Sequence, residues 1–403
     1  MIDELQCANV DEKRDKQMNV WAPLPRESAD MERIWRKSRS FAGDVWFRFR
    51  KKPTSVLGLV VIALLLLFSL IGPFFTPYNY AKQQLSLANI PPLFSVSKGA
   101  SGSFFYITPN LKVIEVDARG QLVRQLSKVK DDSTTKRISF DYSDNYLVND
   151  LVFLDYSTKP MSMLDASGKP MPDGGQLWNR TYVLGTDHLG RDILTRLMYG
   201  TRISLMVAFV AALVNMIIGT IYGGISGYFG GRTDAIMMRI VDVISTIPLT
   251  LYVILIKVML TNGLVSIIIA LSSVYWVDMA RVVRGQVLGL KQQEFIMAAK
   301  TIGTGTKDIL MSHLIPNAMG PILVTVTMLI PSAIFMEAFM SFIGIGIAPP
   351  MASLGTMCND ATEALRTNPY QLLLPALVIC LIMFAFNFVG DGLRDALDPK
   401  LKK

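Results

Sequence analysis

The stretch Glu294–Asn317, EFIMAAKTIGTGTKDILMSHLIPN, lies between two long apolar segments and is the most informative part of the chain. It combines a helical turn rich in small residues, a glycine at position 303, a second helical stretch and a proline where the next apolar segment begins. Ala298 and Ala299 have little bulk, so another backbone can approach them closely, and Gly303 permits a sharp chain reversal. We expect a short projection that fits a groove on a partner protein.

The bulk composition indicates a membrane protein. The chain has 403 residues, of which 51% are hydrophobic and only 18% are charged, and its mean hydropathy is +0.37. This is too apolar for a soluble protein with an ordinary polar surface. Basic residues crowd the approach to the first apolar run, with Asp44 as the acid among them; they are Arg33, Arg36, Lys37, Arg39, Arg48, Arg50, Lys51 and Lys52. Such a cluster beside an apolar run predicts a cytosolic end, and it lacks the interleaved aromatic residues of a nucleic-acid groove.

Six apolar runs are long enough to cross a bilayer, which takes roughly 20 helical residues. They are Val56–Phe75, Ile203–Tyr228, Ile236–Leu260, Val265–Val287, Ala318–Ile347 and Leu372–Val389. If the basic tail is inside, the first run leads outward, and residues 294–317 and the lysine-rich C-terminus both return to the cytosol. Pro248 should kink the third run and Pro331 the fifth, because proline removes a helix hydrogen bond.

We therefore expect an all-α polytopic membrane protein with a mostly β extracytoplasmic insert between its first two helices. The expected segments are a cytosolic basic tail (1–53), a first transmembrane helix (54–76), the insert (77–183), a core of five transmembrane helices (184–395) and a cytosolic tail (396–403).

The insert is rich in β-branched and aromatic residues, in stretches separated by turn residues. These stretches are Ser103–Thr108, Leu111–Asp117, Arg137–Asp141 and Tyr146–Leu154. Nothing in the insert has catalytic spacing, so a structural or docking role is expected. Cys7, Cys358 and Cys380 all lie outside it, so its own apolar core must hold it together. No CxxC or His/Cys ligand set is present, and we expect no metal.

Two glycine-bearing segments have alternative interpretations. Leu184–Asp192, LGTDHLGRD, fits a tight turn that enters a helix, with a helix cap and surface ion pairs. Gly223–Gly231 lacks the Lys-Ser/Thr of a phosphate-binding loop, so it predicts a cytosolic turn that also permits close helix packing.

Two acidic residues within apolar runs are candidates for lining a polar pathway across the bilayer. A charge at the bilayer centre costs on the order of 2.5–3.5 kcal/mol, so such residues usually face a cavity or a partner. Asp278 either pairs locally with Arg281 and Arg284 or lines the pathway. Glu337 has no basic neighbour in its run, and it either lines the pathway or contacts a sister subunit.

The segment 294–317 resembles the cytosolic coupling loop of ABC importer permeases, whose pattern is E-A-A, three residues, G, nine residues, I-x-L-P. Met297-Ala298-Ala299, Gly303 and His313-Leu314-Ile315-Pro316 keep this spacing throughout. Met297 replaces the family glutamate, and two further positions differ at His313 and Ile315. The resemblance implies that the loop contacts an ATPase through Glu294, Ala298, Ala299, Gly303, Pro316 and Asn317.

The segment 184–192 is similar to a signature of the peptide and nickel branch of the same permeases, G-T-D-x-L-G-R-D, which also leads into the second span there. Its residues here are Gly185, Thr186, Asp187, Gly190, Arg191 and Asp192. Further matching segments, among them Val241-Asp242 and Val283-Arg284, extend the resemblance over about 183–400. It implies the type I ABC importer fold, and the C subunit of oligopeptide or dipeptide permeases is the best match.

The resemblance also implies a function and partners. The chain would be the non-catalytic permease subunit of an importer that moves oligopeptides across a bacterial cytoplasmic membrane, with both termini in the cytosol. A homologous second permease, two ABC ATPase subunits and an extracytoplasmic peptide-binding protein would complete the assembly. ATP and Mg²⁺ would bind the ATPase subunits, and this chain would carry no cofactor.

Other functions stay open on the sequence alone. Within the family, a dipeptide, nickel or other small-solute permease is the first alternative. A membrane-anchored sensor would be expected to carry a sizeable cytosolic output domain, whereas the cytosolic loops here are short. A membrane enzyme would need a clustered acid, base or metal set within a span, and the sequence offers none.

Overall fold

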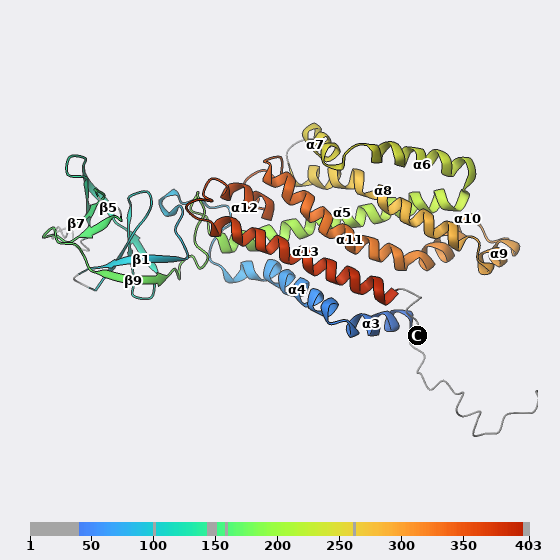
Figure 1. Ribbon diagram of the computed structural model, residues 1–403, viewed down its shortest axis with the longest axis horizontal. Helices are drawn as coiled ribbons and strands as arrows, with labels where there is room; N and C mark the ends of the chain where they lie inside the picture. The colour runs from blue at the N-terminus through green and yellow to red at the C-terminus, as the bar shows by residue number, and fades with distance from the viewer. Residues whose placement is uncertain (1–39, 100–101, 143–150, 158–159, 261–262, 398–403) are drawn as a thin grey trace, which may run out of the picture. The chain divides into compact units, whose positions relative to one another are not determined.

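Long helices make up most of the described part of the chain in the computed structural model (Figure 1), which covers residues 40–99, 102–142, 151–157, 160–260 and 263–397. The helices are α3 (Phe41–Lys51), α4 (Pro53–Leu70), α5 (Ile193–Phe229), α6 (Gly231–Thr246), α7 (Leu249–Met259), α8 (Leu264–Leu290), α9 (Glu294–Thr301), α10 (Thr306–Asp308), α11 (Ile315–Phe342), α12 (Leu354–Ala361) and α13 (Tyr370–Leu397). Shorter turns are the 3-10 turns η1 (Gly72–Phe75) and η2 (Leu85–Leu87) and the π-helical turn η3 (Ile309–Leu314).

Within the described residues, five helical segments are long and apolar enough to cross a membrane. They are Pro53–Leu70, Ile193–Phe229, Leu264–Leu290, Thr306–Phe342 and Tyr370–Leu397. The third predicted run, Ile236–Leu260, is not one straight helix. It divides into α6 and α7, which are bent by 87°. The break falls at Ile247-Pro248, where the backbone is extended, because proline cannot donate the next helix hydrogen bond. The pair counts as a sixth span only if both halves form a single crossing.

Helices α5 and α8 pack closely because glycines replace side chains along one face of α5. A Cβ at Gly219 would lie 2.5 Å from the Met279 side chain, and one at Gly223 would lie 2.3 Å from the Ala280 carbonyl oxygen. Small residues at such spacing let membrane helices approach each other. The predicted turn over Gly223–Gly231 is therefore mostly wrong, because α5 continues to Phe229 and only Gly230, with φ 66°, leaves the helical conformation before α6. The predicted close packing is present.

The insert forms two antiparallel sheets between α4 and α5 in the chain. The strands are β1 (Leu93–Lys98), β2 (Phe104–Ile107), β3 (Val113–Val116), β4 (Leu122–Gln125), β5 (Ser127–Asp132), β6 (Arg137–Asp141), β7 (Leu151–Asp155), β8 (Ser162–Leu164) and β9 (Asp173–Trp178). The sheet orders are β4-β3-β2-β1-β9 and β5-β6-β7-β8. Three of the four stretches predicted as strands contain β2, β3 and β6. The fourth, Tyr146–Leu154, overlaps β7, and its first five residues lie outside the described ranges.

The two sheets share an apolar core. Alternate side chains of a strand point to opposite faces of its sheet, and those on one face of each sheet form this core. Phe105 and Val113 of the first sheet pack in one buried cluster with Phe140 and Leu154 of the second. Along β2, Phe105 belongs to this cluster, whereas Tyr106 belongs to a second cluster on the opposite face of the first sheet. The first sheet is therefore covered on both faces.

Gly223→Ala and Gly285→Ala should have opposite effects on stability. Both residues are helical, but a Cβ at Gly223 would meet the Ala280 backbone, whereas nothing lies within 4 Å of a Cβ at Gly285. We expect Gly223→Ala to destabilise the protein by about 1–3 kcal/mol through overpacking. Gly285→Ala should be neutral or stabilising by about 0.5–1 kcal/mol, since alanine is the better helix former. Thermal unfolding of the two purified variants in detergent tests this, and equal melting temperatures would contradict the packing of α5 on α8.

Candidate functional site

The segment 184–192 forms a compact loop that the two glycines of its motif make possible. Gly185 has φ 80° and Gly190 has φ 72°, in the left-handed region that side chains disfavour. Both also lie against the chain just before β1. A Cβ at Gly185 would be 2.5 Å from the carbonyl oxygen of Ile90, and one at Gly190 would be 1.9 Å from that of Gln84. Glycine is required at both positions for conformation and for space.

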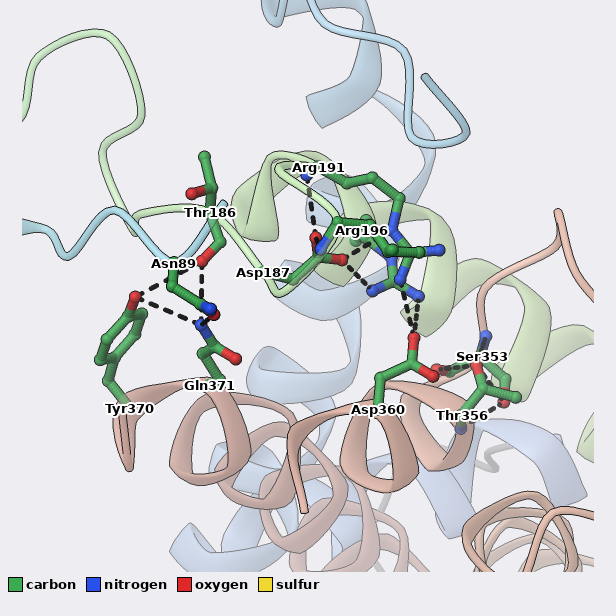
Figure 2. A network of polar contacts seen from close by, with 11 residues as sticks. Asn89, Thr186, Asp187, Arg191, Arg196, Ser353, Thr356, Asp360, Tyr370 and Gln371 are labelled. Carbon is green, nitrogen blue, oxygen red and sulfur yellow. Dashed lines mark hydrogen bonds and ion pairs between the residues drawn. The ribbon is translucent and has the colours of Figure 1, made fainter. Parts of the chain in front are cut away.

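Thr186 attaches this loop to the beginning of the insert (Figure 2). Its hydroxyl donates to the Leu87 carbonyl at 2.5 Å and accepts from the Ile90 N–H at 2.9 Å. Its own N–H donates to the Ile90 carbonyl at 2.9 Å. From α13, the Gln371 amide nitrogen donates to the Thr186 carbonyl at 3.0 Å and to the Asn89 side chain at 2.9 Å. Three segments that are distant in sequence therefore meet at one threonine.

Beside it, two arginines and two aspartates form a closed ring of ion pairs (Figure 2). Asp187 Oδ2 accepts from Arg191 Nε at 2.6 Å and from Arg196 Nη1 at 2.5 Å. Asp360 Oδ2, from α12, accepts from the Nη2 atoms of the same two arginines, each at 2.9 Å. The ring has no net charge, and each guanidinium bridges both carboxylates. It fixes the start of α5 to α12.

The ring determines the protonation of Asp187. Burial alone would raise the pKa of this carboxyl, but Arg196 and Arg191 outweigh burial and hold the pKa below its ordinary value. Asp187, His188 and Asp360 also lie close enough together for a metal ion to bridge them. Both carboxylates are already paired with guanidinium groups, whose positive charge disfavours a cation there. The geometry is that of a structural ion-pair network.

Asp192 closes the motif as the N-cap of α5. Its Oδ2 accepts from the Thr195 N–H at 2.9 Å, which satisfies one of the free donors of the first helical turn. Burial raises the pKa of this carboxyl above its ordinary value, although the hydrogen bonds from Thr195 oppose the rise. The predicted helix cap is confirmed. The ion pairs expected at the surface are instead mostly buried, since the side chains of Asp187, Arg191 and Arg196 are at most 6% exposed.

The predicted coupling loop consists of two helical parts joined at Gly303. This residue has φ 81°, and its N–H donates to the Lys300 carbonyl at 3.0 Å. The Thr304 N–H donates to the Ala299 carbonyl at 3.0 Å. These two bonds form the Schellman arrangement that ends helices at a left-handed glycine. The predicted glycine turn between the two helical parts is confirmed, because α9 ends just before Gly303.

One side of α9 is buried and the other is exposed. Ile296 and Ala299 pack inside the protein, whereas Glu294 and Ala298 are exposed. Large apolar side chains are also exposed along this segment; they are Phe295, Met297, Ile302 and Met311. Ile302 is 82% exposed. At the start of α11, Pro316 and Asn317 are exposed too, and the Asn317 amide donates to the His313 carbonyl at 2.6 Å. This chain segment thus exposes several large apolar side chains that the other described residues leave uncovered.

Asp278 and Glu337 differ in their surroundings. Asp278 is exposed, and its carboxylate lies 3.8 Å from Arg281 Nη1, so the predicted local pair is present. Arg284 does not join it but forms two bonds to Asp234 of α6, at 2.5 and 2.6 Å. Glu337 is completely buried within this chain. Hydroxyls of the same chain, from Ser204 and Ser341, donate to its carboxylate, and its role in the pathway or at a sister subunit stays a prediction.

Comparisons with known proteins assign the chain to a family. Residues 217–403 match the family described as the binding-protein-dependent transport system inner membrane component, and residues 40–92 match the N-terminal transmembrane domain of oligopeptide transport permease C. The oligopeptide transport system permease protein OppC of Bacillus subtilis is 37% identical over 96% of this chain and 98% of its own. The chain belongs to this permease family.

Other relatives of the permease match different shares of the chain. The dipeptide transport system permease protein DppC of Bacillus subtilis is 36% identical over 98% of both chains. OppC of Escherichia coli is 45% identical, over 54% of this permease and 72% of its own chain. A chain from an inward-facing structure of the MetNI methionine ABC transporter overlaps 50% of this permease and 96% of its own length, with a TM-score of 0.43 and 19% identity. Together with the long apolar helices, the family assignment makes this a multi-pass membrane protein.

Sequence reasoning missed several residues of the polar network in this permease. It named the signature but not Asp360, Tyr370 and Gln371, which meet it from α12 and α13. The segment 184–196 holds two arginines, Arg191 and Arg196, and two aspartates, Asp187 and Asp192, so its charges balance and gave no sign that a further acid pairs with the arginines. No local pattern indicated which acid that would be.

Asp187→Asn should destabilise the permease more than Asp360→Asn does. Both acids contact the same two arginines, but the side chain of Asp187 is 6% exposed and that of Asp360 is 29% exposed. Removing the charge from a buried ion pair costs about 3–5 kcal/mol, and water reduces the loss at the more exposed partner. Thermal unfolding of the two purified variants measures the difference. A larger loss for Asp360→Asn would contradict the arrangement of the ring.

Proposed function

We propose that this chain is the transmembrane permease subunit of an ATP-driven importer of oligopeptides in a bacterial cytoplasmic membrane. The similarity to OppC permeases over nearly the whole chain carries this proposal. The chain itself performs no chemistry; ATP and Mg²⁺ bind partner ATPase subunits. The N- and C-termini and α9 lie in the cytosol and the insert lies outside, in keeping with the basic residues that precede α4.

The partners are a homologous second permease, two ABC ATPase subunits and an extracytoplasmic peptide-binding protein. The exposed apolar side of α9 supports contact with an ATPase, because a segment with Ile302 82% exposed and Met297 52% exposed is suited to a groove on another protein. The family spacing of the segment 294–317 supports the same contact.

Transport then requires two states of the permease that differ in the contacts it makes with the ATPase subunits and between its own helices. When the ATPase subunits close, they displace α9. Its buried residues Ile296 and Ala299 belong to the same apolar cluster as Ile309 and Leu314, so the displacement passes to η3 and α11. The Schellman turn at Gly303 makes this connection stiff, because both of its hydrogen bonds are fixed to the end of α9.

Import of dipeptides is the second candidate function. The dipeptide permease DppC of Bacillus subtilis is 36% identical over 98% of this chain, against 37% over 96% for OppC, so identity alone does not separate the two substrates.

Purification and uptake together test the function. We expect the tagged permease to copurify with a homologous permease and an ABC ATPase pair, and cells that lack it to lose uptake of a labelled oligopeptide. An excess of unlabelled oligopeptide should compete for uptake, whereas dipeptide and Ni²⁺ should not. Competition by dipeptide would favour the second candidate, and recovery of the chain as a lone homodimer without ATPase would refute the importer.

Gly303→Val should uncouple ATP hydrolysis from transport, whereas Gly305→Val should not. A valine at φ 81° is strained, by about 1–2 kcal/mol or more, and nothing lies within 4 Å of its Cβ, so the effect comes from the backbone alone. Gly305 has φ −64° and ψ 151°, which any residue adopts. We expect peptide uptake to fall at least about tenfold in Gly303→Val and to stay near normal in the control. Normal uptake and normal peptide-stimulated ATPase activity in Gly303→Val would contradict this mechanism.

A further inference from the structure

Helix α12 is short and is enclosed by the helices that pack against it. None of its eight residues is exposed, and it packs on α5, α11 and α13. Its two ends carry different polar attachments. Ser353 caps the N-terminal end, and Asp360 lies in the last turn. An aspartate near a helix C-terminus opposes the helix dipole, so the two arginines that pair with Asp360 also offset that cost.

One face of α5 contacts the whole length of α12 through residues spaced four apart, which lie above one another on a helix. Arg196 reaches Asp360 at the C-terminal end. At Gly200, a Cβ would lie 3.3 Å from the Leu354 backbone nitrogen, so the two backbones are in close contact. Ser204 accepts a hydrogen bond from the Leu354 N–H at 3.3 Å. This serine therefore satisfies a free donor at the first turn of α12.

Glu337 of α11 completes the N-terminal attachment. Ser204 Oγ donates to one carboxylate oxygen at 2.7 Å, and Ser341 Oγ donates to the other at 2.8 Å. The Ser353 hydroxyl lies 3.4 Å from that of Ser341. The carboxylate is thus the centre of a buried hydrogen-bonded cluster that joins α5, α11 and the cap of α12. Burying a carboxyl group in a membrane protein is costly, so a purely apolar contact would be the less demanding way to pack these helices.

Glycine also brings α12 against α11. A Cβ at Gly355 would lie 2.5 Å from the Ala338 carbonyl oxygen. Helix α12 therefore touches the α11 backbone at Gly355 and the α5 backbone at Gly200, with polar bonds at both ends. Movement of α12 relative to either helix would break the cluster around Glu337 or the ring around Asp360.

We propose that α12 is a brace that keeps the adjoining ends of α5 and α11 in one rigid body throughout the transport cycle, and that Glu337 is the positioning residue of this brace. The inference rests on the proposed importer function only for the existence of that cycle. Relative motion during the transport cycle must then occur in elements that are less firmly attached. The bent pair of α6 and α7 is the foremost of these, because Val241 is the only buried residue of α6 and polar bonds supply much of its attachment, such as Asp234 with Arg284 of α8 and the Tyr222 hydroxyl of α5 with the Met237 carbonyl.

A disulfide between α11 and α12 tests the brace. The hydroxyl oxygens of Ser341 and Ser353 are 3.4 Å apart, so the near-isosteric variant Ser341→Cys/Ser353→Cys should form a disulfide with little backbone movement. The native cysteines are first replaced, as Cys7→Ser, Cys358→Ala and Cys380→Ser. Oxidation is carried out on the whole assembly without nucleotide, with ATP, and with ATP and vanadate. Peptide uptake is measured in the oxidised and the reduced protein.

We expect the same disulfide yield in all three nucleotide states and uptake by the oxidised protein within about twofold of the reduced protein. A disulfide yield that falls in one nucleotide state would overturn the proposal. The absence of the disulfide in all three states would overturn it too. Uptake that stops on oxidation and returns on reduction would overturn it too. If the parent protein takes up no peptide, the importer function fails, and the disulfide yields alone decide whether the brace stands.

Variants of Glu337 test its positioning role. In the cysteine background Glu337→Leu removes both hydrogen-bond acceptors, whereas Glu337→Gln keeps an oxygen that accepts from the Ser204 hydroxyl and adds an N–H that can donate to the sulfur at position 341. We expect Glu337→Leu to lower the disulfide yield at least threefold and to lower the maximal uptake rate, with the peptide concentration for half-maximal uptake unchanged. Glu337→Gln should restore both quantities. Full disulfide yield in Glu337→Leu would refute the role of this residue.

Discussion

The shared contact of Asp187 and Asp360 with Arg191 and Arg196 is the constraint on which the arrangement at this end of the helices depends. It joins a loop, the start of α5 and α12 through four buried or half-buried charges. Such a ring contributes less to net stability than its short distances suggest, because each charge loses its hydration on burial. Its main effect is to fix geometry. Two planar guanidinium groups that each bond both carboxylates hold those carboxylates in one arrangement.

Next to that ring, Thr186 determines where the insert attaches. Its hydroxyl and backbone bond both sides of the segment that leads into β1, and Gln371 of α13 bonds its carbonyl. The signature segment 184–192 is therefore chiefly the place where the insert and the helices are attached to one another. Its glycines give close approach, its threonine bonds the insert, its aspartates pair with arginine or cap a helix, and its arginine bridges two carboxylates.

Much of the helical part was predictable from the sequence, because apolar runs of sufficient length and the proline at 248 determine where helices form and break. The turn at Gly303 was predictable for the same reason, since only glycine favours that conformation. The insert was recognisable as β, but short strands such as β8 have no clear period, and pairing follows from contacts distant in sequence. The hydrogen-bond partners of Glu337 could not be predicted, because Ser204 and Ser341 are ordinary serines that carry no signal of their own.

The first and last strands of the insert lie side by side, with Leu93 opposite Trp178. The chain therefore leaves the helical part and returns to it at neighbouring points, and β strands can be added or lost between those points without moving α4 or α5. Residues 93–216, which contain all nine described strands, lie outside both matched family segments. The strands between those two points can therefore change in number while the helices keep their places, so the insert can adapt one common translocation unit to different surroundings.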